Sequence, residues 1–294
     1  MATLRTFIRQ HPVLTFYVLV FAIGWGTILL IVGGPGAIPG TNEQVQKLFA
    51  FVLLAWFAGP SISGVLMTGL VSGTSGLREL LSRLVRWRVS ARWYAAALLT
   101  GPALVAALLF GLTLFSPAFT PGLIATDDKI GLLLFGIAWG LVGGGLLEEL
   151  GWTGFAVPRL RVRYDAVTTG LIAGLLWGIY HFLIAFWASR SMAGASSSPV
   201  FVGGFVVSYL AALPAYRILL VWVYDRTGSL LLAMLMHAVL SASTIILQPL
   251  TPGVHQLTWN IVLAAALWVI AVSVAAAGRW EPAHQPLHGR LPVH

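Results

Sequence analysis

The stretch that decides the fold is residues 130–150, which read IGLLLFGIAWGLVGGGLLEEL. Its first 18 positions carry no charged side chain, and a helix of about 20 apolar residues is long enough to cross the hydrocarbon core of a bilayer. The two positions that follow in this run are a pair of carboxylates, Glu148 and Glu149. The stretch therefore predicts a membrane-spanning helix that carries two acidic groups into the bilayer.

The composition of the whole chain is that of a multi-pass membrane protein. Of its 294 residues, 58% are hydrophobic and 9% are charged, whereas a soluble domain carries about 25% charged residues. A soluble protein of this length could not bury so much apolar surface, because its surface-to-volume ratio is set by its size. The chain has no cysteine, which excludes disulfides, thiol catalysis and Cys-ligated metals.

Apolar segments and basic residues together predict the topology. The predicted spans lie near residues 13–33, 49–71, 94–117, 130–150, 167–188, 200–222, 229–248 and 257–277. If both chain ends are cytoplasmic, 14 of the 17 arginines and lysines, Arg217 among them, lie on the cytoplasmic side. We therefore expect an all-α membrane bundle of about eight transmembrane helices, N-in and C-in, in a bacterial cytoplasmic membrane. The net charge of +8 then reflects topology and attraction to anionic lipid, and it does not indicate nucleic-acid binding.

One membrane domain with three parts is expected. Residues 1–128 hold three spans and a basic amphipathic helix over 76–93, which is expected on the cytoplasmic surface. Residues 129–248 form the motif-bearing core, and residues 249–294 hold the last span and a disordered cytoplasmic tail. The histidines of the tail are irregularly spaced, so we do not interpret them as a metal site; they are His284, His288 and His294.

Four ionisable side chains lie inside the predicted spans, where such groups are costly and indicate function. They are Glu148 and Glu149 in the fourth span, His181 in the fifth and His237 in the seventh. A helix rise of ~1.5 Å per residue places all four in a common layer near the midplane. Adjacent carboxylates in a poorly hydrated site cannot both ionise easily, and imidazoles can bind or orient water or ligate a metal. The set predicts activation of water for hydrolysis, either directly or on a Zn²⁺ ion held by Glu148, His181 and His237.

Residues one helical turn from these groups complete the candidate site. Three glycines at 143–145 predict a close approach of another backbone. Ser241 follows His237 by one turn and could donate a hydrogen bond to an oxyanion. Four further side chains lie beside the glutamates and His181, and they are expected either to line a substrate channel or to pack in the core: Trp152, Thr153, Trp177 and Tyr180.

Three segments around these residues resemble the motifs of a known family. The segment from Glu148 to Phe155, EELGWTGF, resembles the first motif of the CPBP family, which comprises CAAX prenyl endoproteases and Abi-type membrane proteins. The run from Trp177 to His181 resembles the second motif, and residues 226–230 followed by His237 to Ser241 resemble the third. The resemblance covers residues 140–245. It implies an eight-helix intramembrane protease in which Glu148 is the base, His181 its partner, and His237 a metal ligand or an oxyanion stabiliser. Both a zinc-dependent and a metal-independent mechanism remain open.

Two departures from the family pattern keep other functions open. Thr153 stands where the first motif usually has Arg, and Ser241 where the third usually has Asn or Asp. Loss of the Arg removes an ion-pair partner that would keep the carboxylates charged. The alternatives are a non-catalytic membrane scaffold or immunity factor and a cation-coupled transporter, although the chain lacks the inverted repeats that would support transport. The expected partners are membrane lipid and a membrane-associated, prenylated or signal-like peptide substrate.

Other membrane hydrolases fit the sequence less well. There is no HExxH or GxGD motif. Asp165 and Asp225 each follow a tyrosine, which suggests an aspartyl intramembrane protease, but both lie at predicted helix ends among arginines. We interpret them as caps at the membrane interface.

Overall fold

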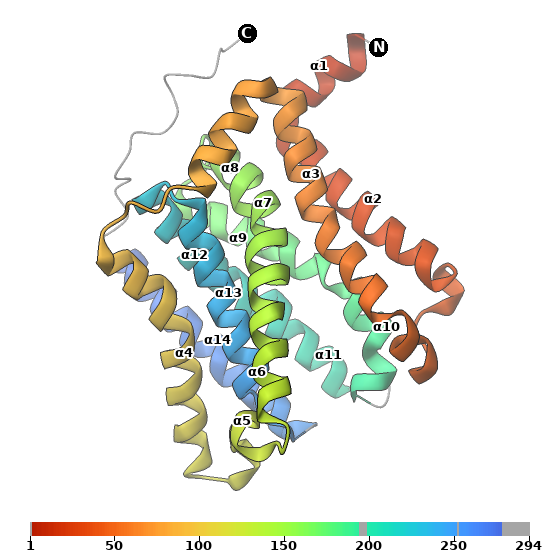
Figure 1. The fold of residues 1–294 in the computed structure, drawn as a ribbon, viewed down its shortest axis with the longest axis vertical. Helices are drawn as coiled ribbons and strands as arrows, with labels where there is room; N and C mark the ends of the chain where they lie inside the picture. The colour runs from red at the N-terminus through yellow and green to blue at the C-terminus, as the bar shows by residue number, and fades with distance from the viewer. Residues whose placement is uncertain (1, 194–198, 252, 278–294) are drawn as a thin grey trace.

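The chain folds into a bundle of helices (Figure 1). The computed structural model describes residues 2–193, 199–251 and 253–277, and this part contains no β-strand. Seven of its helices are long and apolar enough to cross a membrane, or eight if a bent helix pair counts as one span. The predicted all-α membrane bundle is therefore confirmed, while its N-in and C-in orientation stays a prediction. The predicted disordered tail with its histidines lies outside the described residues.

The helices other than those of the fourth and fifth spans can be given in chain order. The N-terminal half holds α1 (Ala2–Gln10), α2 (Pro12–Val32), η1 (Pro35–Ala37), α3 (Asn42–Leu84), α4 (Ala91–Thr113), η2 (Pro117–Phe119) and α5 (Gly122–Ala125). The C-terminal half ends with α11 (Pro199–Phe205), η5 (Val206–Ala212), α12 (Leu213–Thr227), α13 (Leu230–Leu247) and α14 (Val254–Ala276).

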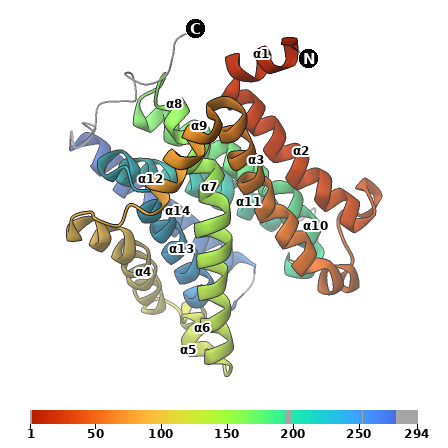
Figure 2. The same cartoon turned by 45° about the horizontal axis from the view of Figure 1, so that its top comes forward.

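The fourth span is a column of α-helical and π-helical segments (Figure 2). It consists of α6 (Lys129–Ala138), η3 (Trp139–Glu148), α7 (Glu149–Gly151), η4 (Trp152–Ala156) and α8 (Val157–Leu160). Segments η3 and η4 have π-helical hydrogen bonding, which is rare and is found frequently at functional sites. The glutamate pair stands at the junction between η3 and α7.

The fifth span is bent at its histidine. Helix α9 (Ala166–Tyr180) and helix α10 (Phe182–Ala193) meet at an angle of 40°, with His181 at the break. A break in a membrane helix frees backbone carbonyls that need donors. Here the indole N–H of Trp25 donates to the carbonyl oxygen of Tyr180 over 2.9 Å. The break is thus held by a contact from α2.

The predicted amphipathic helix over 76–93 is wrong in its extent. Helix α3 begins after a capping box between Thr41 and Gln44, leaves helical geometry at Gly73 (φ 62°, ψ −155°) and ends at Leu84. Residues 86–90 are not helical. Glycine adopts this positive φ at little cost, so the chain can turn there and continue as a short helix.

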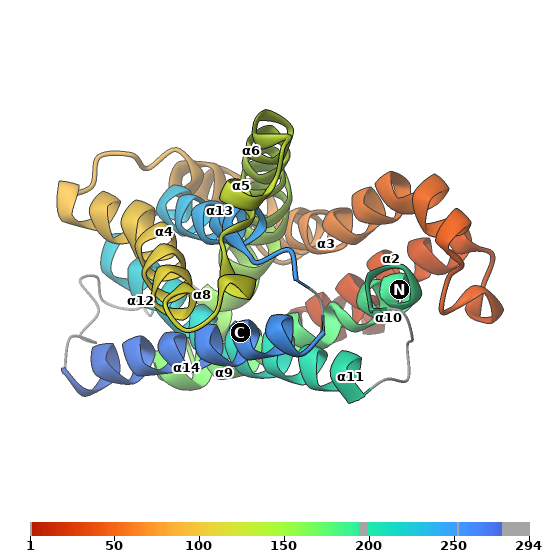
Figure 3. The ribbon, with the colours of Figure 1, turned by 90° about the horizontal axis from the view of Figure 1, so that it is seen from below.

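Close helix contacts place the site in the middle of the bundle. Helix α2 packs on α3, α9 on α12, and α13 lies against both η3 and α4; the view from below shows α13 between α4 and α6 (Figure 3). Helix α3 touches α7 backbone to backbone, because a Cβ atom on Gly64 would lie 2.7 Å from the Cα atom of Gly151. Because α12 also packs on α13, these contacts connect α9 with α13 and with the fourth span, which together carry the candidate site residues.

The two interfacial aspartates differ in role. Asp165 caps α9, and its Oδ1 accepts from the backbone N–H of Thr168 over 2.8 Å, which lowers the pKa of Asp165. The predicted cap is confirmed there. Asp225 instead lies in the last turn of α12 and pairs with Arg161 Nε at 2.8 Å, so its assignment as a cap is wrong.

Candidate active site

The two adjacent glutamates have different partners, although both are buried. Glu148 Oε1 accepts a hydrogen bond from the indole Nε1 of Trp177 over 3.1 Å. Glu149 Oε1 lies 2.7 Å from Nδ1 of His237, and its Oε2 accepts from the hydroxyl of Thr153. One carboxylate is thus bonded to a neutral indole, while its neighbour is bonded to a histidine and a threonine.

His237 on α13 lies between the two carboxylates. A carboxylate accepts hydrogen bonds, so the contact of Nδ1 with Glu149 places the ring proton on Nδ1. The other ring nitrogen, Nε2, lies 3.7 Å from Glu148 Oε2. That separation is too long for a direct hydrogen bond, but a single water molecule could contact both atoms.

His181 is held at the break between α9 and α10. Its Nδ1 lies 2.8 Å from the carbonyl oxygen of Trp177, and because a carbonyl only accepts, the proton is on Nδ1 and Nε2 keeps its lone pair. The ring lies 4.6 Å from the rings of Trp56 and Tyr209, centroid to centroid. The half-buried Tyr209 was not predicted from the sequence. Trp177 bonds both Glu148 and His181, and it therefore links the second motif to the first.

His237 and Ser241 pack closely against Gly144. A Cβ atom on Gly144 would lie 2.9 Å from His237 Nε2 and 2.9 Å from Ser241 Oγ. Gly144 precedes Glu148 by about one turn, so His237 and Ser241 approach the face of the helix that carries this carboxylate. The predicted close approach is confirmed at Gly145, where a Cβ atom would lie 2.8 Å from the Met234 carbonyl oxygen.

Arg217 belongs to the site, and its assignment to the cytoplasmic surface is wrong. It lies on α12 and is fully buried, at 0% exposure. Its Nη1 lies 2.8 Å from both oxygens of Glu149 and 3.4 Å from the hydroxyl of Thr153. Its guanidinium carbon stands 4.2 Å from the ring centroid of Trp177. The sequence does indicate this residue as a candidate, because position 217 falls inside the predicted span 200–222 and an ionisable side chain within a span is costly.

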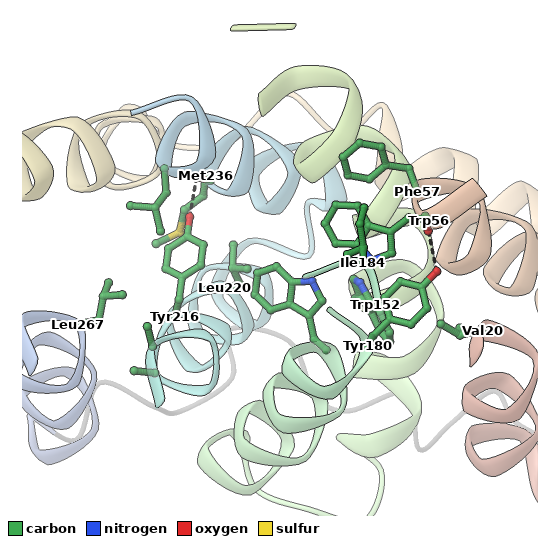
Figure 4. Close-up of a cluster of buried hydrophobic side chains, with 14 of the residues drawn as sticks. Val20, Trp56, Phe57, Trp152, Tyr180, Ile184, Tyr216, Leu220, Met236 and Leu267 are labelled. Atoms are coloured by element: carbon green, nitrogen blue, oxygen red, sulfur yellow. Dashed lines mark hydrogen bonds between the residues drawn. The ribbon is translucent and has the colours of Figure 1, made fainter. Parts of the chain in front are cut away.

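Two of the residues predicted along a substrate channel lie in the packed core instead. Tyr180 is fully buried, and its hydroxyl donates to the Trp56 carbonyl oxygen over 2.6 Å (Figure 4). Trp152 is also fully buried, with its ring 5.8 Å from the rings of Phe16 and Tyr17. The other two, Thr153 and Trp177, are hydrogen-bonded to the glutamates.

Zinc binding by Glu148, His181 and His237 stays a prediction. In the described part of the chain, no group of three or more His, Asp and Glu side chains is placed to hold a metal ion. The Nδ1 atoms of His181 and His237 are bonded to protein oxygens, which leaves the lone pairs of both Nε2 atoms for water or a ligand. What the described residues do form is a buried network in which Glu148, Glu149, His181 and His237 are joined by Trp177 and Arg217. None of these four groups faces lipid, since each is buried.

Comparisons with known proteins match the helices that carry this network. The family model described as "Rce1-like: Type II CAAX prenyl endopeptidase Rce1-like" matches residues 129–243. The chain is also similar to CAAX prenyl protease 2 of Methanococcus maripaludis, with 20% identity over 209 residues, which cover 69% of this chain and 74% of the relative. Residues 129–243 include both glutamates, both histidines, Ser241 and Arg217. These matches cover the segment in which the three motif-like segments gather at one buried site, and they support the similarity to CAAX-type proteases of the CPBP family.

Proposed function

We propose that the protein is an endopeptidase that hydrolyses a peptide bond with water activated by Glu148 and His181. The observation that carries this proposal is that the two glutamates have different hydrogen-bond partners. Glu149 is engaged by Arg217, His237 and Thr153. Glu148 accepts from a neutral indole and faces Nε2 of His237 across 3.7 Å. Glu149 is thus held in an ion pair, and Glu148 can exchange a proton with water.

In the proposed reaction, Glu148 accepts a proton from a water molecule that His181 Nε2 orients. The water oxygen forms a bond to the carbonyl carbon of the substrate, and negative charge develops on the carbonyl oxygen. The hydroxyl of Ser241 donates a hydrogen bond to this oxyanion beside Gly144. Glu148 then passes its proton to the amide nitrogen as the C–N bond breaks, which regenerates the carboxylate.

The proposed substrate is a peptide segment presented at or within the membrane. Two observations support it: the network is buried among spanning helices, and the archaeal relative is named as a CAAX prenyl protease. The test is cleavage of a peptide panel by purified protein in detergent, comparing a C-terminal peptide with a farnesylated cysteine, the same peptide without the lipid, and a signal-like apolar peptide. Cleavage of at least one, with products located by mass spectrometry, is the expected result. A protein that cleaves none of them would favour the non-catalytic scaffold.

Substitution of Gly144 by alanine is expected to lower the cleavage rate by about 10²-fold, comparable to loss of one oxyanion donor. The added methyl group would enter the space beside His237 Nε2 and Ser241 Oγ, at 2.9 Å from each. Gly111→Ala on α4 is the matched control, because no atom lies within 4 Å of a Cβ atom there. Equal rates for the two variants would place the reaction elsewhere.

Chelation tests whether the reaction depends on zinc. Because the described donors do not converge on one point, we expect cleavage to survive treatment with a strong zinc chelator, and zinc to be far below one equivalent in the purified protein. A chelator-sensitive activity restored by added Zn²⁺, with stoichiometric metal, would show instead that the donors rearrange around an ion.

A further inference from the structure

Arg217 carries a charge that is buried within a membrane span. Its position is therefore not explained by the preference of arginines for cytoplasmic loops. Such a group is costly in the bilayer unless it is paired. Its Nη1 lies 2.8 Å from both oxygens of Glu149. The helix that carries Glu149 has no basic residue one turn further on, where Thr153 stands. The positive charge beside Glu149 therefore comes from another helix, α12.

We propose that Arg217 is the positioning residue of the site: it holds Glu149 as an anion and thereby sets the tautomer of His237. The inference rests on the proposed function for its catalytic consequence. The contacts run in one chain, from Arg217 to Glu149 and from Glu149 Oε1 to His237 Nδ1 at 2.7 Å. An anionic Glu149 accepts the proton of Nδ1, which leaves the lone pair of Nε2 toward Glu148.

Loss of Arg217 has a defined consequence for this chain of contacts. Without a cation beside it, a buried carboxylate favours its neutral form. A protonated Glu149 would donate to His237 Nδ1 rather than accept from it. The ring proton would then move to Nε2, which faces Glu148 Oε2 at 3.7 Å. The nitrogen toward Glu148 would become a donor, so a water molecule bound between the two groups could no longer donate to it.

A second contact of Arg217 reaches the other glutamate. Its guanidinium stands 4.2 Å from the ring centroid of Trp177, a cation–π distance. The indole of Trp177 donates to Glu148, and the Trp177 carbonyl accepts from His181. Arg217 therefore contacts the tryptophan that is hydrogen-bonded to both Glu148 and His181.

The position of Thr153 allows the charge to be moved. The Thr153 hydroxyl donates to Glu149 Oε2 and lies 3.4 Å from Arg217 Nη1. The side chain of an arginine at position 153 would thus extend from a backbone position next to the carboxylate of Glu149. The informative variants are Arg217→Met, Arg217→Lys and the double exchange Thr153→Arg with Arg217→Met. Arg161→Met is the control, because it breaks a different ion pair, with Asp225.

The first measurement is the tautomer of His237, read from ¹⁵N chemical shifts of histidine-labelled protein in detergent. We expect the proton on Nδ1 in wild type, Arg217→Lys, Arg161→Met and the double exchange, and on Nε2 in Arg217→Met. This measurement does not need activity, so it tests the inference even if the protein cleaves no peptide. An unchanged tautomer in folded Arg217→Met would overturn the proposal. If Arg217→Met does not fold, a wild-type tautomer in the double exchange still supports the proposal, and an Nε2 tautomer there contradicts it.

The second measurement is steady-state cleavage. Arg217→Met is expected to lower kcat by about 10- to 100-fold, as loss of a group supporting an active-site histidine does, with KM little changed. The double exchange should recover a large part of that loss. A raised KM with an unchanged kcat would contradict positioning through Glu149. A double exchange with a kcat no higher than that of Arg217→Met would also contradict it. Absence of cleavage in wild type would count against the proposed function and leave the tautomer result to decide the role of Arg217.

Discussion

Replacing Glu148 with glutamine is expected to lower the rate of peptide cleavage by about 10²- to 10⁴-fold, the range lost when a general base is removed. Glutamine keeps the size of the side chain and can still accept from the Trp177 indole, which lies 3.1 Å from Oε1. It cannot take a proton from water. The measurement is the initial rate of peptide cleavage, taken with the thermal unfolding temperature of the same sample.

The control for Glu148→Gln is substrate binding. Because only proton transfer is removed, the variant should bind an uncleaved peptide about as tightly as wild type and unfold at a similar temperature. A variant that is folded and binds peptide, but still turns over at the wild-type rate, would exclude Glu148 as the base.

Replacing Glu149 with alanine is expected to destabilise the protein far more than any change at Glu148. Removing one partner of a buried ion pair leaves an uncompensated charge, which costs about 3–5 kcal/mol. Arg217 is that charge here, with its carboxylate partner 2.8 Å away and no exposure to solvent. We expect a clearly lower unfolding temperature and low yield from the membrane.

The matched control removes both charges together. A buried ion pair can be replaced by apolar residues at little cost when both partners change. The double variant Glu149→Leu with Arg217→Leu should therefore be more stable than Glu149→Ala, although we expect it to be inactive. If Glu149→Ala were as stable as wild type, the pair would not contribute to the fold as described.

Much of the fold could be predicted because a membrane restricts the options. Apolar length alone indicated the spans, and the predicted fifth span, 167–188, includes both arms of the bent α9–α10 pair. The bend at His181 could not be predicted, because the donor that satisfies the freed carbonyl at the break, Trp25, lies on a helix distant in sequence. The amphipathic helix was extended too far, since the basic pattern continues through residues 86–90 although the backbone there is not helical.

The candidate site was predicted from the rarity of ionisable groups in spans. This criterion brought out Glu148, Glu149, His181 and His237, which the structure joins in one buried network. The same criterion should have brought out Arg217, but arginines were counted as markers of the cytoplasmic side. Thr153 in place of the motif arginine suggests a weakened site. In the structure a charge from another helix, Arg217, reaches the same carboxylate, and sequence spacing cannot reveal this contact.

The central claim is that water activated by Glu148 and His181 hydrolyses a peptide bond. The most direct test is peptide cleavage by purified wild-type protein in detergent, measured beside Glu148→Ala and His181→Ala under the same conditions. The account predicts cleavage by wild type and loss of cleavage in both variants, with each variant still folded. No cleavage by wild type, or cleavage that survives both substitutions, would contradict it.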